Sequence, residues 1–237
     1  MIRFYAPDIS HTGTLPESES GHCVRVLRRR EGDEVEVVDG KGRLYRGTLL
    51  DAHHKHTTIA IFETVELPKV WAPHITVAVA PTKHADRMEW LVEKLVEIGI
   101  DRFVPLRCEH SERKDIKAER LEKIAVSAMK QSLKAILPQI DDTTPLQAFL
   151  AEEASEAQKF VGYCDADTPR TLLAKAYRAG ADVRILIGPE GDFSPAEIDA
   201  CRRAGYVPVT MGDNRLRTET AALVGADTIH IINQVFS

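Results

Sequence analysis

The stretch ILIGPEGDFSPAEI (residues 185–198) joins an apolar run, a glycine-containing turn and the signals of a helix start. The run ILIG is short, continuous and apolar, which is typical of a buried parallel strand. Ser194 suits an N-cap, Pro195 suits the first helical position, and Glu197 stands where a capping box needs a carboxylate. A buried strand that passes at once into a capped helix indicates an α/β domain with a mainly parallel sheet.

The same alternation of strand and helix patterns continues from Ile75 to the end of the sequence. Apolar residues recur at helical spacing in ADRMEWLVEKLVEIGI (85–100), where Gly99 suits a C-cap. A second amphipathic helix should stop before Pro138. We expect strands at 75–80, 102–106, 159–164, 183–188 and 206–212, and helices at 85–100, 116–136, 171–180, 194–205 and 218–234.

The first 70 residues have a different texture. EVEVVDG (34–40) alternates and ends in the turn signal Asp-Gly, and two further strand patterns follow at 43–52 and 56–67. Several short strands joined by turns predict a small β-barrel. The proline-containing LPKVWAPH (67–74) breaks this pattern, so we place a domain boundary there.

Composition limits the classes of protein to which the chain can belong. Its 237 residues, 43% of them hydrophobic, suit one large domain or two smaller ones. With a net charge of −5, any RNA contact must come from local patches. No apolar run reaches about 18 residues, and MIRFYAPDIS lacks the pattern of a signal peptide, so we expect a cytoplasmic protein. No CxxC pair occurs, and we expect all four cysteines to be reduced: Cys23, Cys108, Cys164 and Cys201.

Two turns, GPEGDFS (188–194) and MGDNRLRTET (211–220), follow predicted strands at the positions where α/β sheets bind ligands. Neither matches a phosphate-binding loop, and the carboxylates of Glu190 and Asp192 would repel pyrophosphate. A glycine turn stiffened by Pro189 suits a nucleoside that is read by backbone groups. An acidic flank tolerates a cation. S-adenosylmethionine, which has adenine, a sulfonium and no phosphate, meets these demands.

ILIGPEGDFSPAEID with MGDNRLRTETAAL closely resembles the bacterial 16S ribosomal RNA uridine N3-methyltransferase family of the SPOUT class. The resemblance also includes HCVRVLRRREGDEVEVVDGKG, DRMEWLVEKLVEIGI, SERK and SAMKQSLKAILPQI, so it covers nearly the whole chain. It implies a PUA-like β-barrel at 1–70 that binds RNA and a SPOUT domain with a trefoil knot at 73–237. It further implies methylation of uracil 1498 at N3, S-adenosylmethionine as cofactor, no metal, and a homodimer whose two subunits form the active site together.

By position, LIGPEG (186–191) and TMGDNRLRTET (210–220) match the cofactor loops of the family. The residues that this match assigns to the cofactor are Leu186, Ile187, Gly188, Pro189, Glu190, Gly191, Met211, Gly212, Leu216, Thr218 and Thr220. The chain departs from the family pattern at three positions. Asp192 replaces a usual glycine, Arg215 is displaced by one position, and Lys134 stands where arginine is common.

Methylation of a uridine N3 requires loss of the N3 proton and donors for the developing negative oxygens. Arg217 and Arg215 are candidates to donate to the uracil oxygens or to a phosphate. A cation at a helix N-terminus opposes the helix dipole, which favours a functional role for Arg217. Glu219 could orient an arginine, accept a proton, or simply complement the dipole.

The segment HCVRVLRRR (22–30) concentrates arginines that could contact phosphates, although a solvated charged loop is the alternative. A second candidate patch follows the strand at 102–106. Aromatic residues make up only 6% of the chain, which favours recognition of a folded RNA by shape and backbone. The predicted RNA-binding residues are Arg25, Arg28, Arg29, Arg30, Arg113 and Lys114.

The run HHKH (53–56) has no separately spaced ligand and does not predict a zinc site. Two alternatives to uridine N3 methylation remain open at this point. The same fold could modify another nucleotide or a ribose 2′-OH, or the chain could bind RNA without catalysis. An intact nucleoside pocket argues against a simple binding protein.

Overall fold

The computed structural model describes residues 2–154, 156–163 and 170–236, and the chain divides into two compact units. The first unit comprises residues 1–70 and 126–137, and the second comprises residues 71–125 and 138–237. Cys164, the last residue of a predicted strand, lies outside the described residues.

The first unit contains a four-stranded sheet of order β1-β2-β3-β4, which confirms the β-rich character predicted for the first 70 residues. Strands β2, β3 and β4 pair antiparallel, whereas β1 runs parallel to β2. The elements before residue 70 are β1 (Arg3–Tyr5), α1 (Ile9–Thr12), α2 (Glu17–Gly21), the π-helix η1 (His22–Val26), β2 (Glu34–Val38), β3 (Arg43–Asp51) and β4 (Thr58–Glu66).

One face of this sheet forms an apolar core, and its other face carries ion pairs. Val35 and Val37 point into the core, as the period of two along a strand requires. Glu36 lies between them in sequence and is also buried, but it pairs with Arg3 and Arg46 at N–O distances of 3.2 Å. The buried carboxylate is thus compensated by two guanidinium groups.

The amphipathic helix predicted at 116–136 is shorter, because α4 spans Ala118–Gln131. Leu133 has a left-handed φ of 56°, and the amides of Leu133 and Lys134 donate to the carbonyls of Lys130 and Met129. These bonds form a Schellman motif, which ends a helix although no glycine is present. The chain beyond it pairs with the turn after β2, where Leu137 N donates to Gly40 O.

The second unit is an α/β domain in which β10-β12-β9-β11-β5-β6-β7 form one parallel sheet and β8 pairs with β6. The predicted parallel sheet is therefore confirmed. Its strands are β5 (Ile75–Val79), β6 (Arg102–Arg107), β7 (Gln139–Ile140), β8 (Thr144–Pro145), β9 (Gln158–Gly162), β10 (Thr171–Leu172), β11 (Val183–Ile187) and β12 (Val207–Thr210).

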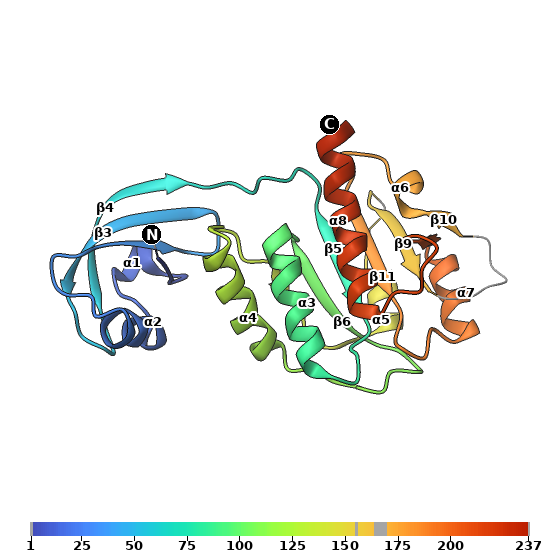
Figure 1. Cartoon of the computed structure of the whole chain (residues 1–237), viewed down its shortest axis with the longest axis horizontal. Helices are drawn as coiled ribbons and strands as arrows, with labels where there is room; N and C mark the ends of the chain where they lie inside the picture. Colours follow the sequence, from blue (N-terminus) through green and yellow to red (C-terminus); the bar gives the residue numbers. More distant parts are fainter. Residues whose placement is uncertain (1, 155, 164–169, 237) are drawn as a thin grey trace. The chain divides into compact units, whose positions relative to one another are not determined.

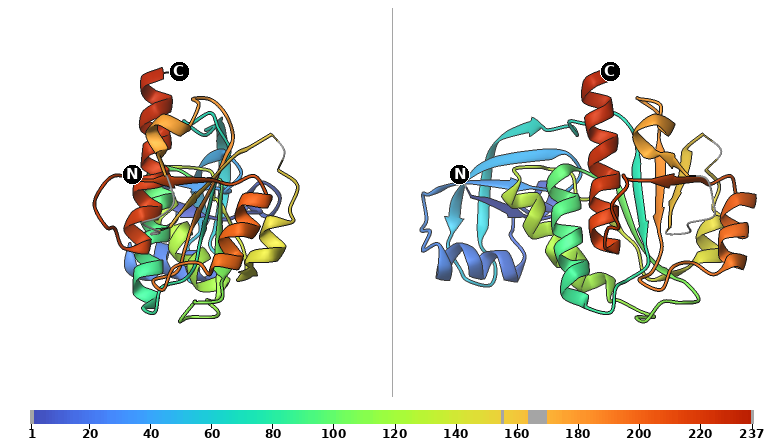
Figure 2. Two further views of the ribbon diagram at one scale, coloured as in Figure 1. Left: turned by 90° about the vertical axis from the view of Figure 1, so that its right-hand side faces the viewer. Right: turned by 45° about the vertical axis from the view of Figure 1, so that its right-hand side comes forward.

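Helices cover both faces of this sheet. In Figures 1 and 2, α3 and α8 lie on one face, and α5 and α7 lie on the other. The central strands β5 and β11 are largely buried, which explains why their sequences are apolar except for Thr76 and Arg184. The helices are α3 (Ala85–Ile98), α5 (Leu146–Leu150), α6 (Leu173–Ala176), α7 (Pro195–Arg203) and α8 (Thr218–Phe236).

Two expectations for this unit need correction. The predicted helix at 171–180 is a single turn, α6, that follows the short strand β10. Tyr177 after it adopts an extended conformation, and its hydroxyl donates to Ala181 O at 2.8 Å, so the chain turns back there. In addition, the strand predicted at 159–164 starts one residue earlier and ends at Gly162.

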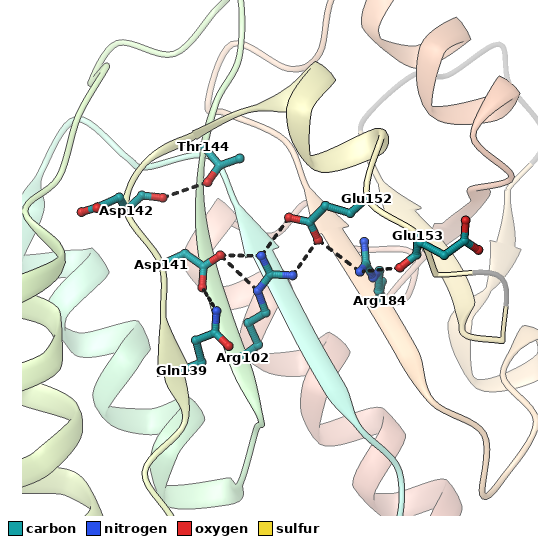
Figure 3. Close-up of polar contacts among 8 residues, drawn as sticks. All are labelled: Arg102, Gln139, Asp141, Asp142, Thr144, Glu152, Glu153 and Arg184. Atoms are coloured by element: carbon teal, nitrogen blue, oxygen red, sulfur yellow. Dashed lines mark hydrogen bonds and ion pairs between the residues drawn. The ribbon is translucent and has the colours of Figure 1, made fainter.

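A network of charged residues lies near the amino-terminal ends of β6 and β11 (Figure 3). Arg102, the first residue of β6, donates to Asp141 at 3.1 Å and to both oxygens of Glu152 at 2.6 and 2.8 Å. Arg184 of β11 also contacts Glu152, at 3.1 Å. These bonds raise the pKa of Arg102 and lower the pKa of Glu152. The network joins segments that are distant in sequence at the sheet edge opposite the strand ends described below.

Candidate functional site: a cavity at the carboxyl ends of the strands

A cavity of about 1150 Å³ opens where β9, β11 and β12 end. This is the edge of a parallel sheet at which ligands characteristically bind. The turn after β11 and the loop after β12 form most of its wall, which brings together the two turns singled out in the sequence. The lining residues from these two segments are Ile187 to Asp192 and Val209 to Thr218.

The turn after β11 is held closely against its surroundings. Gly188 N donates to Gly162 O at the end of β9, and Asp192 N donates to Pro189 O at 2.9 Å. A Cβ atom added to Gly188 would lie 2.9 Å from two ring atoms of Phe193, so only glycine fits there. Asp192 adopts a left-handed φ of 61°, and its Oδ1 accepts a hydrogen bond from Phe193 N.

The capping box predicted at the start of α7 is confirmed. Ser194 Oγ accepts from Glu197 N, and Glu197 Oε2 accepts from Ser194 N at 3.0 Å. The other carboxylate oxygen of Glu197 accepts from Glu109 N at 2.8 Å. The buried Glu197 therefore fixes the helix start and the loop after β6 together.

The loop after β12 packs on two glycines through Met211. A Cβ atom added to Gly162 would lie 3.1 Å from Cε of Met211, and a Cβ atom added to Gly225 would lie 3.3 Å from the same Cε. Gly212 follows with a φ of 135°, which L-residues rarely adopt. Small residues on β9 and α8 thus leave the space that Met211 fills beside the cavity.

The first turn of α8 contacts the turn after β11. Thr218 is buried, and its hydroxyl donates to Gly188 O at 3.3 Å. Glu219 is also buried and pairs with Arg87 of α3, with 3.8 Å between Oε1 and Nε. Arg87 in turn donates to Glu190 Oε1 at 3.2 Å. One guanidinium group therefore lies between the carboxylates of two cavity-forming segments.

The charges that line the cavity are mixed. Three carboxylates and three guanidinium groups belong to its lining residues, which are Glu190, Asp192, Asp213, Arg170, Arg215 and Arg217. Arg215 and Arg217 are both exposed, so their donors are accessible to a ligand. The cavity lining therefore offers both carboxylates and guanidinium groups to a ligand.

Most residues predicted to bind the cofactor line this cavity. Among the described residues, Leu186 and Thr220 do not line it, and neither does the predicted catalytic residue Glu219. Leu186 is instead part of the apolar core. The sequence reasoning missed several residues that the strand-end rule could have found, namely Gly162, Tyr163, Arg170, Val209 and Ala221.

The predicted RNA-binding residues lie in both units. In the first unit, Arg25, Arg28 and Arg30 are exposed, whereas Arg29 is half-buried and lies 3.9 Å from Asp33. In the second unit, Lys114 is exposed. The guanidinium group of Arg113 donates two hydrogen bonds to Lys83 O, at 3.1 and 3.3 Å. Arg113 therefore supports the loop after β5, a role that its position in the sequence did not indicate.

The described residues contain no metal-binding cluster, no activated thiol and no membrane-spanning helix. Within 2–154, 156–163 and 170–236, no group of three or more His, Cys, Asp or Glu residues is arranged to hold a metal ion. Burial raises the pKa of Cys23 to about 11 and that of Cys201 to about 12, and it also raises the pKa of Cys108, so these thiols are poor nucleophiles at neutral pH. No helix in the described part of the chain is long and apolar enough to cross a membrane.

Comparison with known families identifies the class of protein. The family model described as RNA methyltransferase domain matches residues 70–230, and the model described as RNA methyltransferase PUA domain matches residues 15–62. The chain therefore belongs to the RNA methyltransferase family.

Individual relatives narrow this assignment. The chain is 31% identical to ribosomal RNA small subunit methyltransferase E of Mycobacterium bovis, over 95% of this chain and 88% of the relative. A crystal structure of a probable rRNA-methyltransferase from Porphyromonas gingivalis is 46% identical, with a TM-score of 0.94 and complete coverage of both chains. The crystal structure of ribosomal RNA small subunit methyltransferase E from Neisseria gonorrhoeae contains bound S-adenosylmethionine. It is 26% identical to this chain, with a TM-score of 0.86 and 98% coverage of each chain. The resemblance and the fold class inferred from the sequence are thus confirmed.

Proposed function

We propose that this protein transfers a methyl group from S-adenosylmethionine to N3 of a uridine in small-subunit ribosomal RNA, the position called uracil 1498. The observation that carries the proposal is the cavity built jointly by the turn after β11 and the loop after β12. Its position at the carboxyl ends of parallel strands and the relatives named above support the same conclusion.

The residues of the cavity fit this cofactor. The turn after β11 lines the cavity and has no lysine to neutralise a phosphate, and the backbone amides and carbonyls of such a turn suit an adenine edge. The exposed carboxylate of Asp213 tolerates a sulfonium. When bound, S-adenosylmethionine supplies the electrophilic methyl group.

The chain's own residues would orient and activate the uridine. Arg217 and Arg215 line the cavity and are exposed, so they can donate to the uracil oxygens on which negative charge develops as N3 loses its proton to solvent water and takes the methyl group. Glu219 lies beside Arg87 and outside the cavity lining, which favours its role as a partner of an arginine over that of a proton acceptor.

The first unit supports RNA binding. We assign residues 1–70 to a PUA-like RNA-binding domain and residues 73–237 to the catalytic domain. Arg25, Arg28 and Arg30 expose cationic groups that can neutralise phosphates and release their counterions. The expected substrate is the RNA within the assembled small ribosomal subunit. The expected place of action is therefore the cytoplasm.

A second copy of the chain is the expected partner of the catalytic domain. Exposed apolar residues occur on both helices, with between 42% and 73% of each residue accessible: Trp90 on α3 and Ile231, Val235 and Phe236 on α8. Helices α3 and α8 lie side by side on one face of the sheet (Figure 2). Apolar side chains on neighbouring helices are typical of a subunit interface, which supports a homodimer. Sedimentation of the wild type and of an Ile231→Glu variant tests this assembly, because a dimer that uses this face should dissociate.

The deciding experiment is transfer of labelled methyl from S-adenosylmethionine to small ribosomal subunits and to their isolated RNA. Mass spectrometry of the nucleosides should identify N3-methyluridine. A different methylated nucleoside would retain the cofactor and overturn the proposed target. Arg217→Ala should lose turnover while it keeps most of its cofactor affinity, and wild-type turnover in this variant would exclude a catalytic role for Arg217.

A further inference from the structure

Arg87 occupies an electrostatically unfavourable position. It is the third residue of α3, where a cation opposes the helix dipole. Two carboxylates from other segments compensate for this: Glu190 in the turn after β11, at 3.2 Å, and Glu219 in the first turn of α8, at 3.8 Å. The side chain of Arg87 is 28% exposed, so its charge is only partly screened by solvent. Arg87 therefore joins three elements at one point.

The contact with Glu190 is supported from a second direction. Glu190 Oε2 accepts from Lys83 N at 3.2 Å, in the loop between β5 and α3. Arg113 donates to the carbonyl of the same Lys83. Both oxygens of Glu190 are thus engaged, and the turn that carries Gly188 and Gly191 is tied to the start of α3.

Glu219 depends on Arg87 for charge compensation more strongly than Glu190 does. Only 8% of the Glu219 side chain is exposed, and its Oε2 has no hydrogen-bond partner within the described residues. Without Arg87, a buried carboxylate would be left uncompensated at the start of α8. The neighbouring Thr218 lines the cavity and binds Gly188 O, so a shift of this turn would reach the ligand directly.

We propose that Arg87 is a positioning residue that holds the turn after β11 against the first turn of α8 and so keeps the cofactor cavity in its binding shape. This inference rests on the proposed function, because the ligand of the cavity is taken to be S-adenosylmethionine. Arg87 acts through Glu190 and Glu219 and does not touch the reacting atoms.

Direct calorimetric binding of S-adenosylmethionine to the full chain tests the proposal without RNA. Arg87→Ala should raise the Kd by about 10- to 100-fold, as expected for the loss of one charge-assisted hydrogen bond and of the ion pair that compensates the buried Glu219. Arg87→Lys should recover part of the affinity, because a single ammonium keeps the charge but cannot fork towards two carboxylates. In turnover assays, the KM for the cofactor should rise more than kcat falls. Lys94→Ala removes an ion-paired cation from the same helix and is the matched control, with an unchanged Kd.

A double-mutant cycle separates positioning from a general loss of stability. In a background that carries both Glu190→Gln and Glu219→Gln, the further change Arg87→Ala should alter the Kd by less than about twofold, because its partners are already neutral. Fully additive effects would overturn the proposal, as would a Kd within twofold of wild type for Arg87→Ala. Should Arg87→Ala not fold, an unchanged Kd in Arg87→Lys would overturn it equally. A wild-type chain that binds no S-adenosylmethionine would instead contradict the proposed function.

Discussion

The glycine pair of the GPEG turn allows a sharp test of how the cavity is built. A methyl group on Gly188 would sit 2.9 Å from the Cδ2 and Cε2 atoms of Phe193. Phe193 is 6% exposed and belongs to the core between the sheet and helices α5 and α7, so its ring cannot move aside freely. The turn itself must therefore shift. That shift would stretch the hydrogen bond from Thr218 to Gly188 O at the start of α8.

The size of the effect follows from overpacking. A methyl group forced into a packed core costs about 1–3 kcal/mol of unfolding free energy. For a chain of this length, each kcal/mol lowers Tm by about 2–4 °C, so Gly188→Ala should melt about 2–12 °C below the wild type. Gly191 lies in the same turn, but its nearest neighbour to an added Cβ is His110 Cβ at 3.3 Å, on an exposed loop. Gly191→Ala should change stability by less than about 0.5 kcal/mol.

Differential scanning calorimetry and calorimetric titration with S-adenosylmethionine on both variants would measure the two quantities. Gly188→Ala should lower Tm and weaken cofactor binding together, because the same displacement of the turn causes both. Gly191→Ala should keep a Tm much closer to that of the wild type. Equal effects of the two substitutions on Tm, or a Gly188→Ala protein with the Tm and affinity of the wild type, would refute this account of the turn.

Substitutions at three further places test other features of the structure. Chemical denaturation of Asp192→Ala should show a free energy of unfolding about 1–2 kcal/mol below that of the wild type, because alanine keeps the left-handed strain and loses the hydrogen bond from Phe193 N. Asp192→Gly relieves that strain and should lie within about 0.5 kcal/mol of the wild type. Arg102→Ala should destabilise the fold by at least about 2 kcal/mol at neutral pH. The lowered pKa of Glu152 gives stability that is complete above the ordinary carboxyl pKa and is lost as the pH falls through the lowered value, so Arg102→Ala should also flatten the acid limb of a stability profile. Combined replacement of the arginines at 28–30 by alanine should weaken RNA binding and reduce its salt slope, and an unchanged slope would identify them as a solvated loop.

The fold could be predicted from the sequence wherever a local residue pattern determines the element. The buried strands β5 and β11 are mainly apolar, with only Thr76 and Arg184 as exceptions, and the capping box of Ser194 and Glu197 marked the start of α7 to the residue. The end of α4 could not be predicted in this way. Leu133 adopts the left-handed conformation there, a position that usually calls for glycine, because the following chain pairs with the turn at Gly40. That long-range pairing has no local signature.

The site, too, could be predicted only in part from the sequence. The two loops were evident because glycines and charged residues interrupt apolar strands there, and the cavity lies between them. Arg87 could not be recognised, since its position in α3 looks like one more charged residue on an amphipathic helix. Its importance comes from Glu190 and Glu219, which lie 103 and 132 residues further along the chain and approach it only in the folded sheet. Contacts of this kind depend on topology, which residue spacing does not encode.

The structure also changes the physical reason why the GPEG turn suits a nucleoside. In the sequence, Glu190 and Asp192 looked like an acidic flank that would attract a cation and repel phosphate. In the fold, Glu190 accepts hydrogen bonds from Arg87 and from Lys83 N, and Asp192 Oδ1 accepts one from Phe193 N. These carboxylates act first on the protein, by fixing the backbone of the turn. Recognition of the ligand is therefore left to the shape of that backbone, which Gly188 and its packing on Phe193 determine. A preformed backbone edge of this kind selects a neutral heterocycle better than it selects a phosphate, because the turn has no lysine to neutralise one.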